Sequence, residues 1–359
     1  MLRRADGISV ILHGSRGSSG GKRRRRSLRS NQGVPNQEKG RLKSQTQCTD
    51  GLDKMQKFLV RRFLLAFVTL LSVSLIIFIM SRVSGDPRHI YLDDYSTQED
   101  WDRMGAVLGL DKPYYQQYGI FLKGAFRGDF GESVREGRPV TEVVIERAPA
   151  TLLLGGVAFV MSLLIGVPLG ILSAVKRGTM MDAFGKFVAL IGQSAPPFWL
   201  GIMLMFFFAV KMGWVPPYGK QSWNSIILPA VTLGWYYAAA NLRLVRSAML
   251  DVLDSEYIKL ARAKGVNSRT IIMKHAFRNA LIPPLTFAGV TIGALVTGSL
   301  VVETVFAWPG LGRLAIEALF AFDYPLLQGV VITFTLLYVT AAFVVDVAYA
   351  YVDPRIRYA

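Results

Sequence analysis

The chain has 359 residues, of which 52% are hydrophobic, and its mean hydropathy is +0.34. Charged residues make up 18% of the chain, below the roughly 25% that is typical of soluble domains, so an ordinary soluble protein is excluded. The formal net charge is +16, and the single cysteine, Cys48, excludes an intramolecular disulfide and a cluster of thiol metal ligands.

Residues 1–54 form a polar segment with a net charge of +9, from 13 Lys and Arg against 4 Asp and Glu. Gly, Ser, Arg and Gln dominate this segment, a composition typical of a disordered tail. The basic run Lys22–Arg26 would also suit an anionic-lipid anchor or a nucleic-acid arm, but a tail without an assigned role is the better interpretation, and we expect no nucleic-acid partner. Basic residues and an apolar run follow Met55, which suggests that translation naturally begins there.

Six apolar runs are long enough to cross a hydrocarbon core of ~30 Å, which takes about 20 helical residues. Each must be helical, because lipid offers no partner for unpaired backbone groups. The fold class is therefore an all-α membrane protein with six transmembrane helices, the first within residues 55–82. The predicted spans are Phe63–Met80, Thr151–Val175, Phe187–Val210, Ser225–Leu242, Leu281–Val302 and Pro325–Val345.

The segments between the spans differ in charge. Residues 81–147 have a net charge of −3, from 9 basic and 12 acidic side chains, whereas residues 243–279 have a net charge of +5, from 8 basic and 3 acidic ones. Lys and Arg near span ends resist translocation. We therefore expect both termini, including the tail 351–359, and the basic loop in the cytoplasm. Residues 83–147 form the extracytoplasmic segment, with short helical patches around Gln98–Leu108 and Pro113–Phe126.

Prolines and glycines predict irregular places within the bundle. Pro196-Pro197 should break or bend the third span. Small residues at Gly166 and Gly170, and at Gly289 and Gly293, should let helix backbones approach closely. Near the outer mouth, residues 308–322 are expected to form a short amphipathic helix.

The basic loop 243–279 contains a helix-prone run from Glu256 to Gly265 and a second one that ends at Asn279. A glycine after a helical run is a signal for a helix end, because glycine adopts the left-handed conformation without a Cβ clash. The loop should therefore present two short helices, joined by a turn, to the cytosol. Such a structure is a docking device, which indicates that something outside this chain drives it.

Several kinds of chemistry are missing from the sequence. No Walker A motif is present, so the chain has no loop to hold nucleotide phosphates. The histidines His13, His89 and His275 are far apart, which argues against a metal site, and we expect no cofactor and no catalytic residues. The spans lack paired carboxylates, which argues against a stand-alone ion-coupled carrier.

A series of short motifs in residues 55–359 resembles the inner-membrane permeases of binding-protein-dependent ABC importers, specifically the dipeptide/oligopeptide (peptide/nickel) group. Each motif alone is weak, but their order together with the topology is very specific. The motifs are Gly128-Asp-Phe-Gly-Glu-Ser133, Arg147-Ala-Pro-Ala-Thr-Leu152, Ala195-Pro-Pro-Phe-Trp-Leu-Gly201, Ala261-Arg-Ala-Lys-Gly265, His275-Ala-Phe-Arg-Asn-Ala-Leu281, Glu303-Thr-Val-Phe-Ala-Trp-Pro-Gly-Leu-Gly312, Asp323-Tyr-Pro325 and Asp353-Pro-Arg355.

The resemblance implies a type I ABC importer fold, with the transmembrane domain in residues 148–350, in the bacterial inner membrane. It implies a permease that carries peptides together with a second homologous permease, two cytoplasmic ATPase subunits and an extracytoplasmic solute-binding protein. The loop would be the helix that couples the permease to the ATPase, although Lys259-Leu260-Ala261 stands where the family has Glu-Ala-Ala. The coupling residues would be Glu256, Tyr257, Ala261, Arg262, Ala263, Gly265, His275, Arg278 and Asn279.

The solute and its path are less constrained by the sequence. Relatives within the group carry peptides, glutathione, nickel chelates or sugars, so another solute is an open alternative, as is a stand-alone carrier or channel. Polar residues within the spans are candidates to line the path, although hydrogen bonds between packed helices explain them equally well. These candidates are Gln193, Ser194, Asn241, Thr291 and Thr297.

Overall fold

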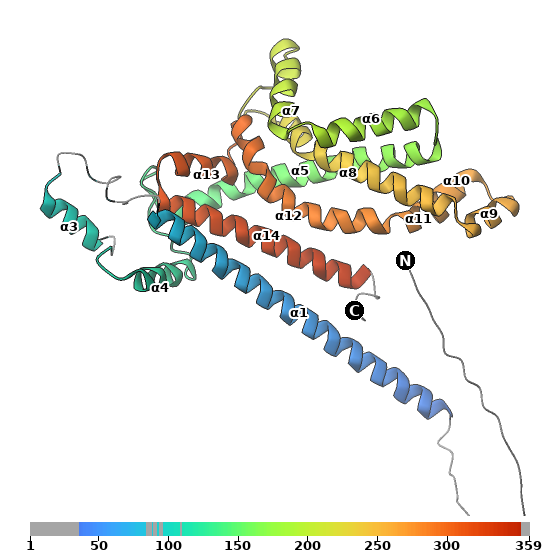
Figure 1. Cartoon of the computed structure of the whole chain (residues 1–359), viewed down its shortest axis with the longest axis horizontal. Coiled ribbons are helices and arrows are strands. Elements are labelled where there is room, and N and C mark those ends of the chain that lie inside the picture. Colours follow the sequence, from blue (N-terminus) through green and yellow to red (C-terminus); the bar gives the residue numbers. More distant parts are fainter. Residues whose placement is uncertain (1–35, 84–87, 89–91, 93–95, 108–109, 353–359) are drawn as a thin grey trace, which may run out of the picture. The chain divides into compact units, whose positions relative to one another are not determined.

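A computed structural model describes residues 36–83, 88, 92, 96–107 and 110–352 (Figure 1). Throughout these residues the regular elements are helices, and the one β feature is an isolated bridge between Glu132 and Pro139. The prediction of a mostly helical chain is confirmed. The chain divides into two units, residues 1–52 and residues 53–359, and the second unit holds the helix bundle.

Helix α1 runs from Asn36 to Val83. The composition predicted a disordered tail up to residue 54, yet residues 36–54 are helical, while residues 1–35 lie outside the described residues. The difference has a physical reason. Residues 36–54 lack proline and are rich in helix formers, and extending a helix that the apolar span has already nucleated costs little.

The segment before the second long helix contains α3 (Gln98–Val107) and α4 (Tyr114–Ala125), which confirms the two predicted helical patches. Helix α4 is fastened to α1. The ring of Tyr118 lies 5.3 Å from that of Phe78, and its hydroxyl lies 2.9 Å from the hydroxyl of Ser74. Helix α4 is therefore packed against the first long helix.

Helices α5 (Val140–Val175) and α8 (Ile227–Leu253) form the centre of the bundle. Their backbones nearly touch, because a Cβ on Gly166 would lie 2.5 Å from the Ala238 carbonyl oxygen, and one on Gly234 would lie 2.6 Å from the Ala158 carbonyl oxygen. The close approach predicted at Gly166 is confirmed. Pro168 lies inside α5 without ending it.

The third predicted span is broken. Helix α6 (Met180–Ser194) ends just before Pro196-Pro197, and α7 (Pro197–Leu204) continues into a π-helical segment, η1 (Met205–Lys211). The two arms meet at an angle of 110°, which confirms the predicted break. In Figure 1, α7 projects sideways from the layer that α6 and α8 form. A short 3-10 turn, η2 (Trp223–Ile226), then leads into α8.

The last helices are α12 (Ile282–Val305), α13 (Leu311–Phe320) and α14 (Tyr324–Val352). Helix α12 bends by 56° between Leu295 and Thr297. A Cβ on Gly293 would lie 2.9 Å from the ring of Tyr338, so α12 and α14 approach closely where predicted. Helix α13 is the expected short helix, and its Arg313 and Glu317 form an ion pair of 2.7 Å.

Among the described residues, three helices are long and apolar enough to cross a membrane, or up to five if each bent pair counts as one span. The fourth predicted span, Ser225–Leu242, lies mostly within α8 and is not among these candidates. Many of its side chains are buried inside the bundle, where packing against protein rather than lipid tolerates polar residues such as Asn241.

Candidate functional site

The loop between α8 and α12 folds into four short pieces, α9 (Glu256–Ala263), α10 (Ser268–Thr270), η3 (Ile271–Ala276) and α11 (Phe277–Ala280). Figure 1 shows them at one end of the bundle, the end at which α5 turns back into α6. The predicted pair of helices joined by a turn is confirmed, with the second helix divided by a π-helical stretch. We call residues 254–281 the docking loop.

The turn after α9 is built around Gly265, whose φ is +77°, in the left-handed region that glycine enters freely. The Gly265 N–H donates to the Arg262 carbonyl at 2.9 Å. The Val266 N–H donates to the Ala261 carbonyl at 3.2 Å. Together these bonds form a Schellman motif, which satisfies the last carbonyls of the helix and reverses the chain sharply.

Apolar side chains fix the docking loop to the ends of two core helices. Ile258 and Ala276 are fully buried. They share one cluster with Met249 and Leu253 of α8 and with Ala174 of α5. Burying a side chain such as that of Ile258 contributes roughly 1.5–3 kcal/mol. The docking loop is therefore joined to α5 and α8 through a packed core.

A polar contact closes the docking loop on its exposed side. The Asn279 amide donates to the Tyr257 hydroxyl at 2.9 Å and to the His275 carbonyl at 3.0 Å. It thereby joins the first piece, α9, to the last, α11. The structure thus brings together three of the residues that the sequence assigned to the coupling loop.

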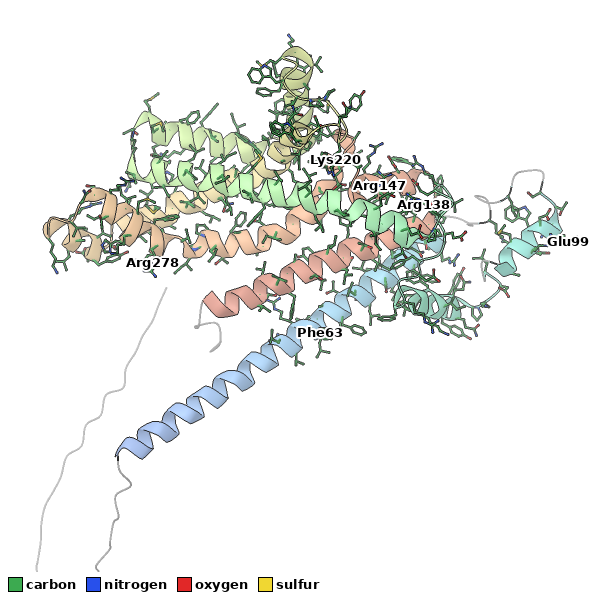
Figure 2. All side chains as sticks on the ribbon, turned by 180° about the vertical axis from the view of Figure 1, so that it is seen from behind. Phe63, Glu99, Arg138, Arg147, Lys220 and Arg278 are labelled. Carbon is green, nitrogen blue, oxygen red and sulfur yellow. The ribbon has the colours of Figure 1, made fainter. Side chains whose placement is uncertain are left out.

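The other residues assigned to the coupling loop lie mostly on its free surface. The Glu256, Arg262, Ala263 and Arg278 side chains are exposed, whereas Ala261 is half-buried against the apolar cluster. In Figure 2, Arg278 lies at this end of the bundle and Arg138 lies at the opposite end. The exposed face also carries Lys264, Arg269 and Lys274, so it is basic and suits an acidic partner surface.

The five residues predicted to line a path occupy different environments. Gln193 is half-buried and Ser194 is exposed, both at the end of α6 before the break. Thr297, on α12, is exposed and donates to its own helix at the Ala294 carbonyl. Thr297 therefore lies on a different helix from Gln193 and Ser194.

Asn241 and Thr291 are buried instead of open to a path. Thr291 donates to the Phe287 carbonyl of its own helix at 2.8 Å. Asn241 is fully buried where α8 packs against Gly166 of α5, and neither atom of its amide has a hydrogen-bond partner.

A buried cluster of polar groups lies at the other end of the bundle and was not predicted from the sequence; we call such a hydrogen-bonded cluster a polar knot. Asp323 is fully buried, and its carboxylate accepts the Ser133 hydroxyl at 2.6 Å. The backbone N–H groups of Arg135 and Leu326 donate to it at 3.1 Å each. One carboxylate therefore ties the turn before α5 to the corner between α13 and α14.

A second knot holds the start of α13. Glu303 is fully buried, and one of its oxygens accepts the N–H of Gly312 at 2.7 Å, where the helix dipole favours a negative charge. The Trp308 indole donates to the Ala150 carbonyl at 2.9 Å, and the Leu311 N–H donates to the Thr151 hydroxyl at 2.8 Å. The available signal was that Asp323, Ser133 and the residues of the second knot belong to the motifs quoted above.

In the part of the chain that the structure describes, no three His, Cys, Asp or Glu side chains come close enough to hold a metal ion. The contacts of the docking loop and of the two knots are packing and hydrogen bonds, which fix helices relative to one another. The arrangement suits the transmission of movement along the bundle.

Comparison with known families gives two matches. The family described as "Binding-protein-dependent transport system inner membrane component" matches residues 166–358. The family described as "Binding-prot-dependent transport system membrane comp, N-term" matches residues 55–155. Together they cover both the first long helix and the bundle with its docking loop.

Two relatives are similar over their whole length. The oligopeptide transport system permease protein AppB of Bacillus subtilis (strain 168) is 38% identical over 316 residues, which is 85% of this chain and 100% of that protein. The glutathione transport system permease protein GsiC of Escherichia coli (strain K12) is 38% identical over 305 residues, with the same shares.

A solved structure shares the fold. It is the inward-facing MetNI methionine ABC transporter, which matches with a TM-score of 0.50 and 23% identity, over 59% of this chain and 96% of that one. The bundle described here therefore has the fold of that transporter's chain.

Proposed function

Because the chain belongs to the family of binding-protein-dependent transport system inner membrane components, we propose that it is the permease subunit of an ATP-driven importer of peptides. It is a multi-pass protein of the bacterial inner membrane, and its family are transport permeases rather than catalytic enzymes. Peptides are the proposed solutes because the two relatives are named as permeases for oligopeptides and for glutathione, itself a tripeptide.

The proposed partners are a second homologous permease, two cytoplasmic ATPase subunits and an extracytoplasmic solute-binding protein. The ATPase would bind the docking loop. Two observations support binding of the ATPase to this loop. One face of the loop is exposed and basic, with Arg262 and Arg278, and its other face is packed onto α5 and α8. Closure of the ATPases would then displace the ends of two core helices as a rigid body.

The proposed topology has six spans with both termini in the cytoplasm. Helix α8 would supply the fourth span in chain order, since 27 residues reach about 40 Å at 1.5 Å per residue. The docking loop would face the cytoplasm, and residues 83–147 would face outward. Residues 148–350 would form the transmembrane domain proper, after a first helix in 55–82. Membrane lipid would surround the exposed apolar side chains of α1, such as Phe63.

For the translocation path we keep Gln193, Ser194 and Thr297 as lining residues in contact with the second permease or the solute. Their side chains are partly or fully exposed, which supports this role. For Asn241 and Thr291 the same role would require α8 or α12 to move, because both side chains are buried.

The observation that carries the proposal is the docking loop, closed by a Schellman turn and packed onto the core. The test is reconstitution in liposomes. The chain alone should accumulate no radiolabelled peptide against a gradient, whereas the chain with its second permease, ATPases and binding protein should do so when ATP is supplied. Uphill accumulation by the isolated chain would contradict the proposal.

A further inference from the structure

A buried ion pair lies where α5, α6 and α8 meet, near the docking loop. The Asp182 carboxylate of α6 is 1% exposed. Arg246 of α8 donates to both of its oxygens, from Nε at 2.7 Å and from Nη2 at 3.1 Å. Ser173 of α5 donates to the same carboxylate at 2.7 Å. One side chain therefore connects three helices.

Two further donors complete the site. The Gly178 N–H, in the turn between α5 and α6, donates at 3.1 Å, and the Lys186 ammonium lies 3.0 Å away. A buried carboxylate is tolerated only when charge and hydrogen bonds compensate it, and here both oxygens are satisfied. The two-pronged guanidinium contact fixes orientation as well as distance.

The other buried residues through which α6 contacts the bundle are all small. Apart from Asp182, the buried residues of α6 are Gly185, Ala189 and Gly192. Such small residues allow close approach but interlock little with a neighbour. The ion pair is therefore the contact that fixes how α6 sits along α8.

Arg246 stands about two helical turns before the end of α8 at Leu253. Apolar side chains between them, including Met249, share one cluster with side chains of the docking loop. At its far end α6 runs into the 110° break before α7. Helix α8 thus contacts the docking loop near its C-terminal end and contacts α6 through Arg246.

We propose that Asp182 and Arg246 are positioning residues that carry the movement of the docking loop from α8 to α6 and the broken helix α7. The inference rests on the proposed function, in which ATPases move the docking loop. Without the ion pair, α8 would still move, but α6 would slide along it instead of following.

Spin labels on α6 and α8 test this proposal. The labels replace Leu190 and Asp251, both exposed, after Cys48 has been changed to Ser. The assembled transporter, with its second permease and ATPases in lipid nanodiscs, is measured by double electron–electron resonance, without nucleotide and trapped with ATP and vanadate. With the ion pair intact, the distance distribution between the labels should stay narrow and unchanged on trapping.

The test variant is Arg246→Lys, which keeps the charge but loses the two-pronged contact. Its distance distribution should shift or broaden on trapping, while ATP hydrolysis continues and peptide import per ATP falls several-fold. A distribution identical to that of the unaltered chain would overturn the proposal. If Arg246→Lys fails to fold, Asp182→Asn with Arg246→Gln gives a neutral pair for the same measurement, judged in the same way.

A matched control uses the exposed ion pair between Arg177 and Asp254, 3.3 Å apart, which joins the α5–α6 turn to the end of α8. Arg177→Gln should leave both the distribution and the import ratio unchanged, and an effect as large as that of Arg246→Lys would count against the proposal. Failure of the unaltered chain to assemble with ATPases would instead contradict the proposed function.

Discussion

At the scale of single residues, the shape of the docking loop depends on one backbone conformation. Gly265 has a φ of +77°, and a Cβ added there would meet nothing within 4 Å. The cost of a side chain is therefore backbone strain, not collision. For an L-residue in the left-handed region that cost is roughly 1–2 kcal/mol. The cost is larger for a β-branched residue, which adopts this conformation least readily.

Gly265→Val should abolish peptide uptake by the reconstituted transporter while the protein remains inserted in the membrane. The strained turn would misplace α9, although the hydrophobic spans are untouched. Gly265→Asn is the control, because Asn tolerates the left-handed conformation, and it should keep most of the uptake. Normal uptake by the Val variant would count against the docking role of the loop.

Another prediction at this scale concerns the polar knot at Asp323. Asp323→Ala removes a fully buried acceptor of three hydrogen bonds. Hydrogen bonds to a charged group contribute about 1.5–3 kcal/mol each, so the midpoint of thermal unfolding in detergent should fall clearly. Ser133→Ala should have a smaller effect, because two backbone donors remain. Equal midpoints for both variants and the unaltered chain would contradict this account.

At the scale of the elements, the bundle depends on the close approach of α5 and α8. A Cβ on Gly234 would come within 2.6 Å of the Ala158 carbonyl oxygen, whereas one on Gly156 would meet nothing within 4 Å. Replacing a helical glycine by alanine normally favours the helix by about 1 kcal/mol. Alanine should therefore destabilise the protein at Gly234, where the Cβ would collide, and should not destabilise it at Gly156.

Gly234→Ala should lower the midpoint of thermal unfolding, because it forces the two central helices apart. Gly156→Ala, an exposed position in α5, should leave the midpoint unchanged or raise it. Detergent-solubilised protein followed by circular dichroism would show both effects. If Gly234→Ala is as stable as Gly156→Ala, the two helices are not in the contact described.

At the scale of the whole molecule, the N-terminal family match begins at residue 55, the position at which the sequence suggested a start. Deleting residues 1–54 should therefore leave membrane insertion and peptide uptake of the reconstituted transporter unchanged. Uptake by the shortened and full chains, compared at equal amounts of inserted protein, checks this. A large loss of uptake would assign residues 1–54 a role in transport.

The structure of the docking loop was predicted from the sequence only in part. The turn at Gly265 was predicted, because a glycine after a helical run is a local signal. The contact between Tyr257 and Asn279 joins residues far apart in the loop, so no local pattern revealed it. The buried position of Asn241 was equally hidden, because an apolar span does not show which of its faces meets another helix.

Composition and local pattern were enough to predict helices in lipid, their approximate limits, the break at Pro196-Pro197 and the docking loop. Contacts between distant residues, such as Asp323 with Ser133 and Asp182 with Arg246, became visible only once the helices were packed together. The difference lies in the distance along the sequence over which each effect acts. Helix formation and bending depend on neighbours a few residues away, whereas buried polar pairs depend on how distant helices pack.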